Sequence, residues 1–109
     1  MRVAIIGSRT LNMPIPEGIV PKNTTEILSG GANGIDRSAR AFALAHRIRI
    51  VEVLPDYDRY GRSAPLRRND EIIAAADLVL AFWDGKSRGT KYVIDCCHEI
   101  GKPVKVIRG

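Results

Sequence analysis

The sequence has no apolar run as long as a membrane span requires. Its first residues, Met1 to Gly7, carry one charged side chain and are too short for a signal peptide. They are typical of a first β-strand. The chain is 109 residues long, which is enough for one domain and too short for two. We therefore expect a single domain over residues 1–109, with no contact to a membrane.

Cysteine is scarce, with two residues that are adjacent in the chain, Cys96 and Cys97. Adjacent helical residues do not easily reach disulfide geometry, which argues against a disulfide-stabilised secreted protein. The spacing of Val93, Cys96, Cys97 and Ile100 is that of one helical face, so both thiols are predicted to pack in the core. We expect reduced thiols and a cytoplasmic location.

Several catalytic patterns are also missing. There is no Walker lysine motif, no cluster with metal-ligand spacing and no nucleophile elbow. The glycine-rich stretch over residues 30–34 lacks the spacing of a dinucleotide fingerprint. We expect neither a metal nor a cofactor. The chain has one tryptophan, three tyrosines and two phenylalanines, not interleaved with a basic stripe, which disfavours a channel that stacks single-stranded bases.

Basic residues are in excess, since 17 Lys and Arg stand against 12 Asp and Glu, for a net charge of +5. Much of this excess is arginine, whose planar fork suits phosphate. The excess is typical of a protein that binds a nucleotide or nucleic acid, although a soluble basic surface explains it equally well.

The apolar pattern alternates between strand-like and helix-like periods. Continuous β-branched runs predict five strands, at Val3–Ile6, Glu26–Ser29, Ile48–Leu54, Leu78–Trp83 and Val104–Ile107. Apolar residues at helical spacing follow the second, third and fourth runs and predict three helices. Between residues 9 and 25, three prolines and one glycine exclude a long first helix. The fold class is therefore α/β: a Rossmann-like, three-layer fold with a five-stranded, mainly parallel sheet and a first crossover helix that is shortened or missing.

Loops rich in glycine, arginine and small hydroxyl residues follow the strands. In open parallel sheets, ligands bind beyond the carboxyl ends of the strands, and helix N-termini there hold phosphate. We therefore expect a ligand site formed by Gly7, Ser8, Arg9, Gly30, Gly31, Ala32, Asp36, Asp56, Arg68, Asn69, Trp83, Ser87, Gly89 and Thr90. Any catalytic residue is unknown, with Arg68, Asp56 and Asp84 as candidates.

Each feature also has a purely structural explanation. Asn33 and Asp36 have the spacing of a capping box, and Ser87 or Thr90 is suited to cap the last helix. Trp83 and Tyr57 are more often packing residues than stacking platforms. The aspartates of these loops are more often ordinary loop carboxylates than acid–base pairs.

The motif order resembles the SLOG superfamily, named for the DNA-uptake protein Smf/DprA and the cytokinin-activating LOG enzymes. The resemblance is carried by Gly7-Ser8-Arg9, the stretch 29–36, Asp56-Tyr57 with Arg67-Arg68-Asn69, and the stretch 81–90. It covers nearly the whole chain and is strongest to the small stand-alone YspA/YpsA-like branch. The resemblance implies a Rossmann-like domain that senses or processes nucleotides or nucleotide-derived ligands.

The LOG phosphoribohydrolases use an arginine and a Gly-Thr-x-x-Glu element. Arg68 and the pair Gly89-Thr90 match them, but Val93 stands at the glutamate position and cannot stabilise developing positive charge. The resemblance therefore favours phosphate binding over hydrolysis by the LOG route.

Three functions follow as hypotheses. The first is a sensor or processing module that binds a phosphate-bearing, nucleotide-derived small molecule. The second is a nucleoside 5′-monophosphate phosphoribohydrolase, an N-glycosidic-bond hydrolase, and the third is a single-stranded DNA-binding protein of the Smf/DprA type. A short first crossover would leave one sheet face thinly covered, so we also expect a homodimer or higher homo-oligomer.

Overall fold

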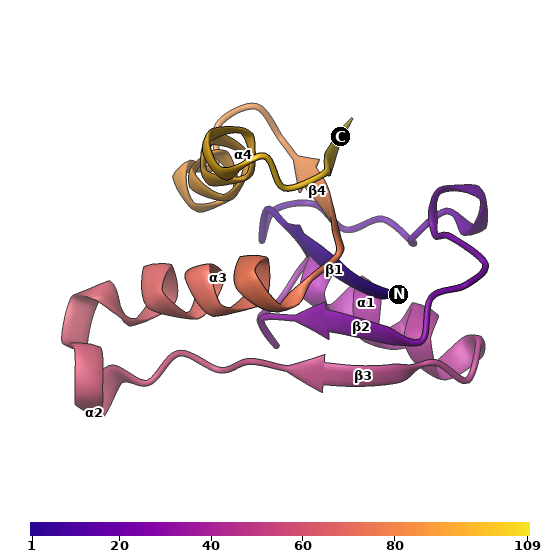
Figure 1. Ribbon diagram of the computed structural model, residues 1–109, viewed down its shortest axis with the longest axis horizontal. Coiled ribbons are helices and arrows are strands. Elements are labelled where there is room, and N and C mark those ends of the chain that lie inside the picture. Colours follow the sequence, from indigo (N-terminus) through magenta and orange to yellow (C-terminus); the bar gives the residue numbers. More distant parts are fainter.

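The computed structural model describes residues 1–109, and a parallel sheet of five strands forms its centre (Figure 1). The strands are β1 (Arg2–Gly7), β2 (Glu26–Ser29), β3 (Arg49–Glu52), β4 (Leu78–Trp83) and β5 (Val104–Arg108). Every neighbouring pair is parallel, in the order β3-β2-β1-β4-β5. The α/β fold class predicted from the sequence is confirmed. The third strand is shorter at both ends than predicted.

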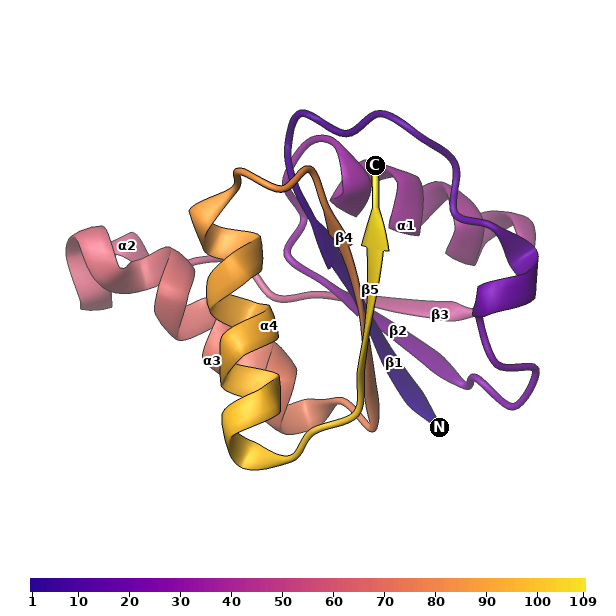
Figure 2. The ribbon, with the colours of Figure 1, turned by 90° about the horizontal axis from the view of Figure 1, so that it is seen from above.

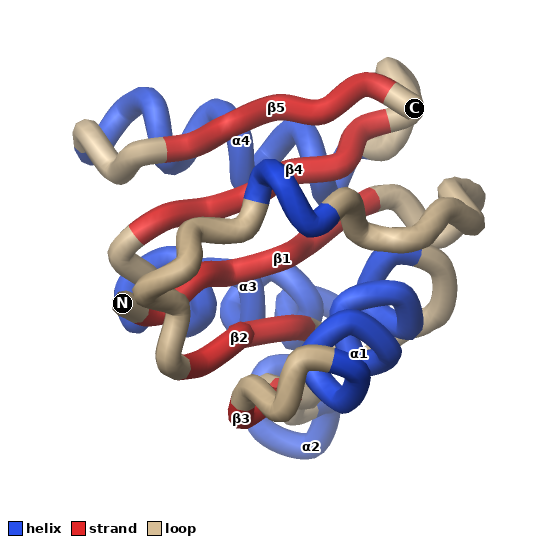
Figure 3. Tube along the Cα trace, turned by 90° about the vertical axis from the view of Figure 1, so that its right-hand side faces the viewer, coloured by secondary structure: helices blue, strands red, loops and turns tan.

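Helices cover both faces of the sheet and make three layers. They are η1 (Glu17–Ile19), α1 (Ile35–Ala45), α2 (Tyr57–Tyr60), η2 (Gly61–Ser63), α3 (Ala64–Ala75) and α4 (Arg88–Ile100). In Figures 2 and 3, α3 and α4 lie on one face of the sheet, and α1 lies on the other. No helix combines the length and the apolar character that crossing a membrane requires.

The first crossover is a loop with a single 3-10 turn, η1, as the prolines predict. It runs across the same sheet face as α1 (Figure 3). Its side chains Ile15 and Val20 are 6% and 8% exposed and pack in one cluster with Phe82 of β4. The thinly covered sheet face expected from the sequence is therefore absent, because the loop buries its own apolar residues there. A homo-oligomer is still predicted, but a thinly covered sheet face no longer supports that prediction.

The core consists of two clusters, one on each face of the sheet. Alternate residues of β1 divide between them: Val3 and Ile5 face α1, while Ala4 and Ile6 face α3 and α4. The buried face predicted for the last helix ends earlier than the spacing indicates, because Ile100 is exposed. The predicted burial of the thiols holds for Cys97, whereas Cys96 is half-buried.

The order of the strands reverses at the centre of the sheet. The chain moves outward from β1 to β2 and β3, and then returns to place β4 on the other side of β1. The crossovers on the two sides cover opposite faces (Figure 2). A crevice therefore opens at the carboxyl ends of β1 and β4, where such folds bind ligands.

Candidate functional site

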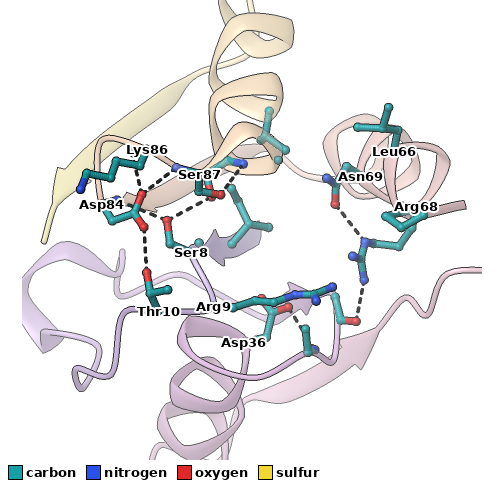
Figure 4. Close-up of a pocket in the computed structure, with 18 residues that line it drawn as sticks. Ser8, Arg9, Thr10, Asp36, Leu66, Arg68, Asn69, Asp84, Lys86 and Ser87 are labelled. Carbon is teal, nitrogen blue, oxygen red and sulfur yellow. Dashed lines mark hydrogen bonds between the residues drawn. The ribbon is translucent and has the colours of Figure 1, made fainter. Parts of the chain in front are cut away.

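A cavity of about 550 Å³ lies at this reversal point, between the loops that follow β1, β2 and β4 and the start of α3 (Figure 4). Its volume is within the range of small-molecule sites. Of the residues expected at the site, those that line it are Gly7, Ser8, Arg9, Gly30, Ala32, Asp36, Arg68, Asn69, Ser87, Gly89 and Thr90. Asp84, a catalytic candidate, also lines it.

Three residues expected at the site lie outside this cavity. A Cβ on Gly31, whose φ is +70°, would point at the Leu54 side chain instead. The Trp83 indole N–H donates to the Ser87 carbonyl at 3.0 Å, so its structural role is packing against the loop. Asp56 accepts the Arg59 backbone N–H at 3.1 Å, caps α2 and lines a smaller, second cavity.

The start of α4 contributes hydroxyls and free backbone donors. Ser87 is the N-cap, and its Oγ accepts the Thr90 N–H at 3.4 Å. The Thr90 hydroxyl lies 3.1 Å from Ser87 Oγ and 3.5 Å from Ser8 Oγ, so three hydroxyls form a chain along the cavity wall. The N–H groups of Arg88 and Gly89 have no acceptor in the chain. These donors and the positive end of the helix dipole favour an anion.

Asp84 ties the loop after β4 to the loop after β1. Its Oδ1 accepts the backbone N–H groups of Ser87 and Lys86, both at 2.8 Å, and its Oδ2 accepts the Thr10 hydroxyl at 2.7 Å. These hydrogen bonds, with that of Ser87 the strongest, hold the pKa of Asp84 well below its usual range. A carboxylate with its oxygens so occupied is a poor general base.

The glycine loop after β2 brings a buried carboxylate and a buried guanidinium together. Asp36 and Arg68 are 7% and 9% exposed. A Cβ on Gly30 would lie 2.5 Å from Arg68 Nη1 and 2.9 Å from Asp36 Oδ2, so a larger residue there would displace one of these two side chains. Arg68 Nη1 donates to the Gly30 carbonyl at 2.7 Å, and Nε donates to Asn69 Oδ1 at 2.9 Å.

The predicted capping box is not formed. Gly34, with φ at +72°, is the N-cap of α1, and no side chain caps the helix there. Asp36 turns back to accept the Ala32 N–H at 3.1 Å, while Asn33 accepts a hydrogen bond from Arg37. The helix therefore begins one residue later than a capping box at Asn33 requires.

Burial works against the charge on both members of this pair. It raises the pKa of Asp36, although the Ala32 N–H and the Arg68 charge oppose the rise. It lowers the pKa of Arg68, against the attraction of Asp36, while the charge of Arg9 lowers it further. Arg68 Nη2 has no hydrogen-bond partner in the chain, and Arg9 is exposed with no side-chain partner. Both guanidiniums therefore keep donors available to a ligand.

The cavity also has lining residues that the sequence did not single out as ligand contacts, notably Thr10, Lys86 and Leu66. Lys86 lies in the loop after β4. Its positive charge just before a predicted helix is the sequence feature that could have indicated a ligand contact. Thr10 and Leu66 carried no signal, because their placement depends on how the first crossover and α3 fold back.

Val93 is 2% exposed, packs in the core and forms part of the cavity wall. An apolar side chain therefore lies where the LOG resemblance places a glutamate. No histidine lines the cavity. The groups present are hydroxyls, backbone N–H donors and cations, which suit holding an anion.

Fold and site together define a Rossmann-like α/β protein with a cavity at the reversal point of its sheet. No family model matches the chain. It is 34% identical over 84 residues to the Gene 61 protein of Mycobacterium phage D29, an alignment that covers 72% of this chain and 67% of the phage protein. The chain belongs to the family of that phage protein.

A solved structure extends the comparison to the fold. DNA processing protein A from Helicobacter pylori, studied for its mode of single-stranded DNA binding, matches 97% of this chain with a TM-score of 0.71 and 25% identity. The chain spans 64% of that protein's length. This neighbour is a Smf/DprA protein, so the fold is compatible with the SLOG superfamily.

Proposed function

We propose that this protein binds a phosphate-bearing, nucleotide-derived small molecule in the main cavity and acts as a sensor or processing module, in the manner of the YspA/YpsA-like branch. The observation that carries the proposal is the start of α4. There the N–H groups of Arg88 and Gly89 have no acceptor in the chain, and Gly89 lines the cavity together with the hydroxyl-bearing residues Ser8 and Thr90. Backbone donors at a helix N-terminus are a common phosphate site.

The charges around the cavity support the same ligand class. Arg9, Arg68 and Lys86 line it, against Asp36 and Asp84. Both carboxylates already accept hydrogen bonds within the chain. The Arg9 side chain forms no hydrogen bond that a ligand would have to replace. A phosphate near α4 therefore meets cations that keep free donors.

The test is calorimetric titration with inorganic phosphate and a panel of nucleoside 5′-monophosphates. We expect binding that Arg9→Ala weakens about tenfold, since a hydrogen bond to a charged group contributes about 1.5 kcal/mol or more. Arg62→Ala is the matched control, because Arg62 is exposed and lines neither cavity. Equal affinities for the two variants would place the site elsewhere, and no binding of any nucleotide would overturn the proposal.

Binding of single-stranded DNA is the second candidate function. The specific observation in its favour is the fold shared with DNA processing protein A, over 97% of this chain. The excess of basic over acidic residues in the sequence also agrees with binding of DNA. Fluorescence anisotropy with a labelled oligonucleotide at increasing salt separates the two candidates, because several phosphate contacts give a steep loss of affinity with salt. Hydrolysis of the LOG type is not proposed, since Val93 offers no carboxylate.

A further inference from the structure

A second cavity of about 220 Å³ lies on the other side of Arg68, which lines both cavities. Its lining residues come from the segment after β3, from α2 and from α3. Figure 1 shows α2 and the start of α3 at the projecting end of the ribbon. Tyr60, Asp56 and Glu71 contribute to its wall. None of these residues is used by the phosphate site described above.

Tyr60 lines this second cavity and lies beside two arginine side chains. The guanidinium carbons of Arg59 and Arg67 lie 5.1 and 5.5 Å from the centre of its ring, within cation–π distance. Leu54, which also lines the cavity, is 66% exposed. Nucleobases stack on aromatic rings and on arginine planes of this kind, largely without regard to sequence.

The carboxylates of the second cavity are available to a ligand. Glu71 has no hydrogen-bond partner, Asp56 accepts one backbone N–H, and neither belongs to any ion pair of the chain. Arg59 and Arg68 also line this cavity, so its two positive and two negative side chains give no net charge that would attract a second phosphate. The carboxylates of Asp56 and Glu71 can accept hydrogen bonds from the exocyclic amino group of a base, such as N4 of cytosine. The cavity therefore suits an uncharged, planar ligand with N–H donors.

We propose that the second cavity is a nucleobase subsite and that the ligand consists of two nucleosides joined by a phosphate. The phosphate lies in the main cavity, Arg68 lies between the two parts, and the second base lies over Tyr60. This inference rests on the proposed function, because it requires the phosphate site. A free dinucleotide and the end of a single strand share this chemistry.

The experiment measures the affinities of thymidine 5′-monophosphate, the dinucleotide pTpT and a ten-residue oligothymidine for the whole chain. We expect pTpT to bind about tenfold tighter than the monophosphate, as one stacked base contributes. Tyr60→Ala should remove this gain and leave the monophosphate affinity unchanged. Tyr60→Phe should keep the gain. Tyr57→Ala is the matched control, because Tyr57 is an exposed tyrosine that lines neither cavity.

Glu71→Gln, at an exposed position, tests the same subsite without touching Tyr60. It should weaken the cytidine dinucleotide pCpC about fivefold and leave pTpT unchanged. Monophosphate binding without a dinucleotide gain, or a gain that survives Tyr60→Ala, would overturn the subsite and leave the phosphate site standing. Absence of all nucleotide binding would overturn both. Oligothymidine equal to pTpT identifies a dinucleotide ligand, and much tighter binding of the oligonucleotide identifies a strand.

Discussion

Arg9 and Arg68 line the same cavity, but their surroundings give them different roles. Arg9 is exposed and has no side-chain hydrogen bond. Arg68 is 9% exposed, and its guanidinium donates to the carbonyls of Gly30 and Val53 and is attracted by the buried carboxylate of Asp36. Arg68 therefore holds the ends of β2 and β3 together in addition to offering a donor to a ligand. Loss of the Arg68 side chain should therefore destabilise the fold as well as weaken ligand binding.

Arg68→Ala should lower the free energy of unfolding by about 3 kcal/mol, because it leaves Asp36 buried without a nearby cation and removes the donor to two carbonyls. Arg9→Ala should change it by less than about 0.5 kcal/mol, as is usual for an exposed side chain. Urea denaturation of both variants measures the difference. Equal unfolding midpoints would mean that Arg68 does not stabilise the fold.

At the scale of the element, α1 ends in a strained position. Arg47 has φ at +55°, in the left-handed region, and is the one non-glycine residue of the chain with a positive φ. The Ile48 N–H donates to the Ala43 carbonyl at 2.9 Å, and the Arg47 N–H to the Leu44 carbonyl at 3.4 Å. This is the hydrogen-bond pattern of a Schellman motif, in which glycine is the favoured residue at the position of Arg47.

Arg47→Gly should therefore stabilise the protein by about 0.5–1 kcal/mol, since glycine adopts this conformation without the clash of a Cβ. Arg47→Ala is the control: it removes the same charge but keeps the Cβ, so little change is expected. Thermal unfolding followed by circular dichroism compares the two. A glycine variant no more stable than the alanine variant would contradict the interpretation.

At the scale of the whole molecule, Asp84 joins the two halves of the sheet at its reversal point. It accepts the Thr10 hydroxyl from the loop after β1, and N–H groups from its own loop after β4. Because its pKa is lowered in the folded chain, its ionised form stabilises the fold above the ordinary aspartate pKa of 3.8. This stabilisation is lost as the pH falls below that value toward the folded-state pKa.

Asp84→Asn should therefore flatten the dependence of stability on pH below about pH 4, where the wild-type protein loses the contribution of the ionised carboxylate. Urea midpoints measured from pH 6 down to pH 2 give both curves. Asp58→Asn, at an exposed carboxylate without a hydrogen-bond partner, should keep the wild-type slope. Parallel curves for wild type and Asp84→Asn would contradict the prediction.

The order of strands and helices along the chain, the parallel sheet and the missing first helix follow from the amino-acid sequence alone. These features are local: apolar period distinguishes strand from helix, and prolines between residues 9 and 25 exclude a helix wherever the chain packs. It also indicated most residues that line the cavity, because in a parallel sheet the segments after the strands share one edge.

The directions of the side chains at that edge, in contrast, depend on how the whole chain packs. Trp83 ends β4 and Asp56 follows β3, as Ser8 follows β1, but neither Trp83 nor Asp56 lines the main cavity, whereas Thr10 and Leu66 do. The same holds for Asp36, whose spacing suited a cap but whose carboxylate is buried near Arg68, 32 residues away in the chain. Sequence spacing determines which strand end a residue follows, whereas its direction depends on contacts between distant segments.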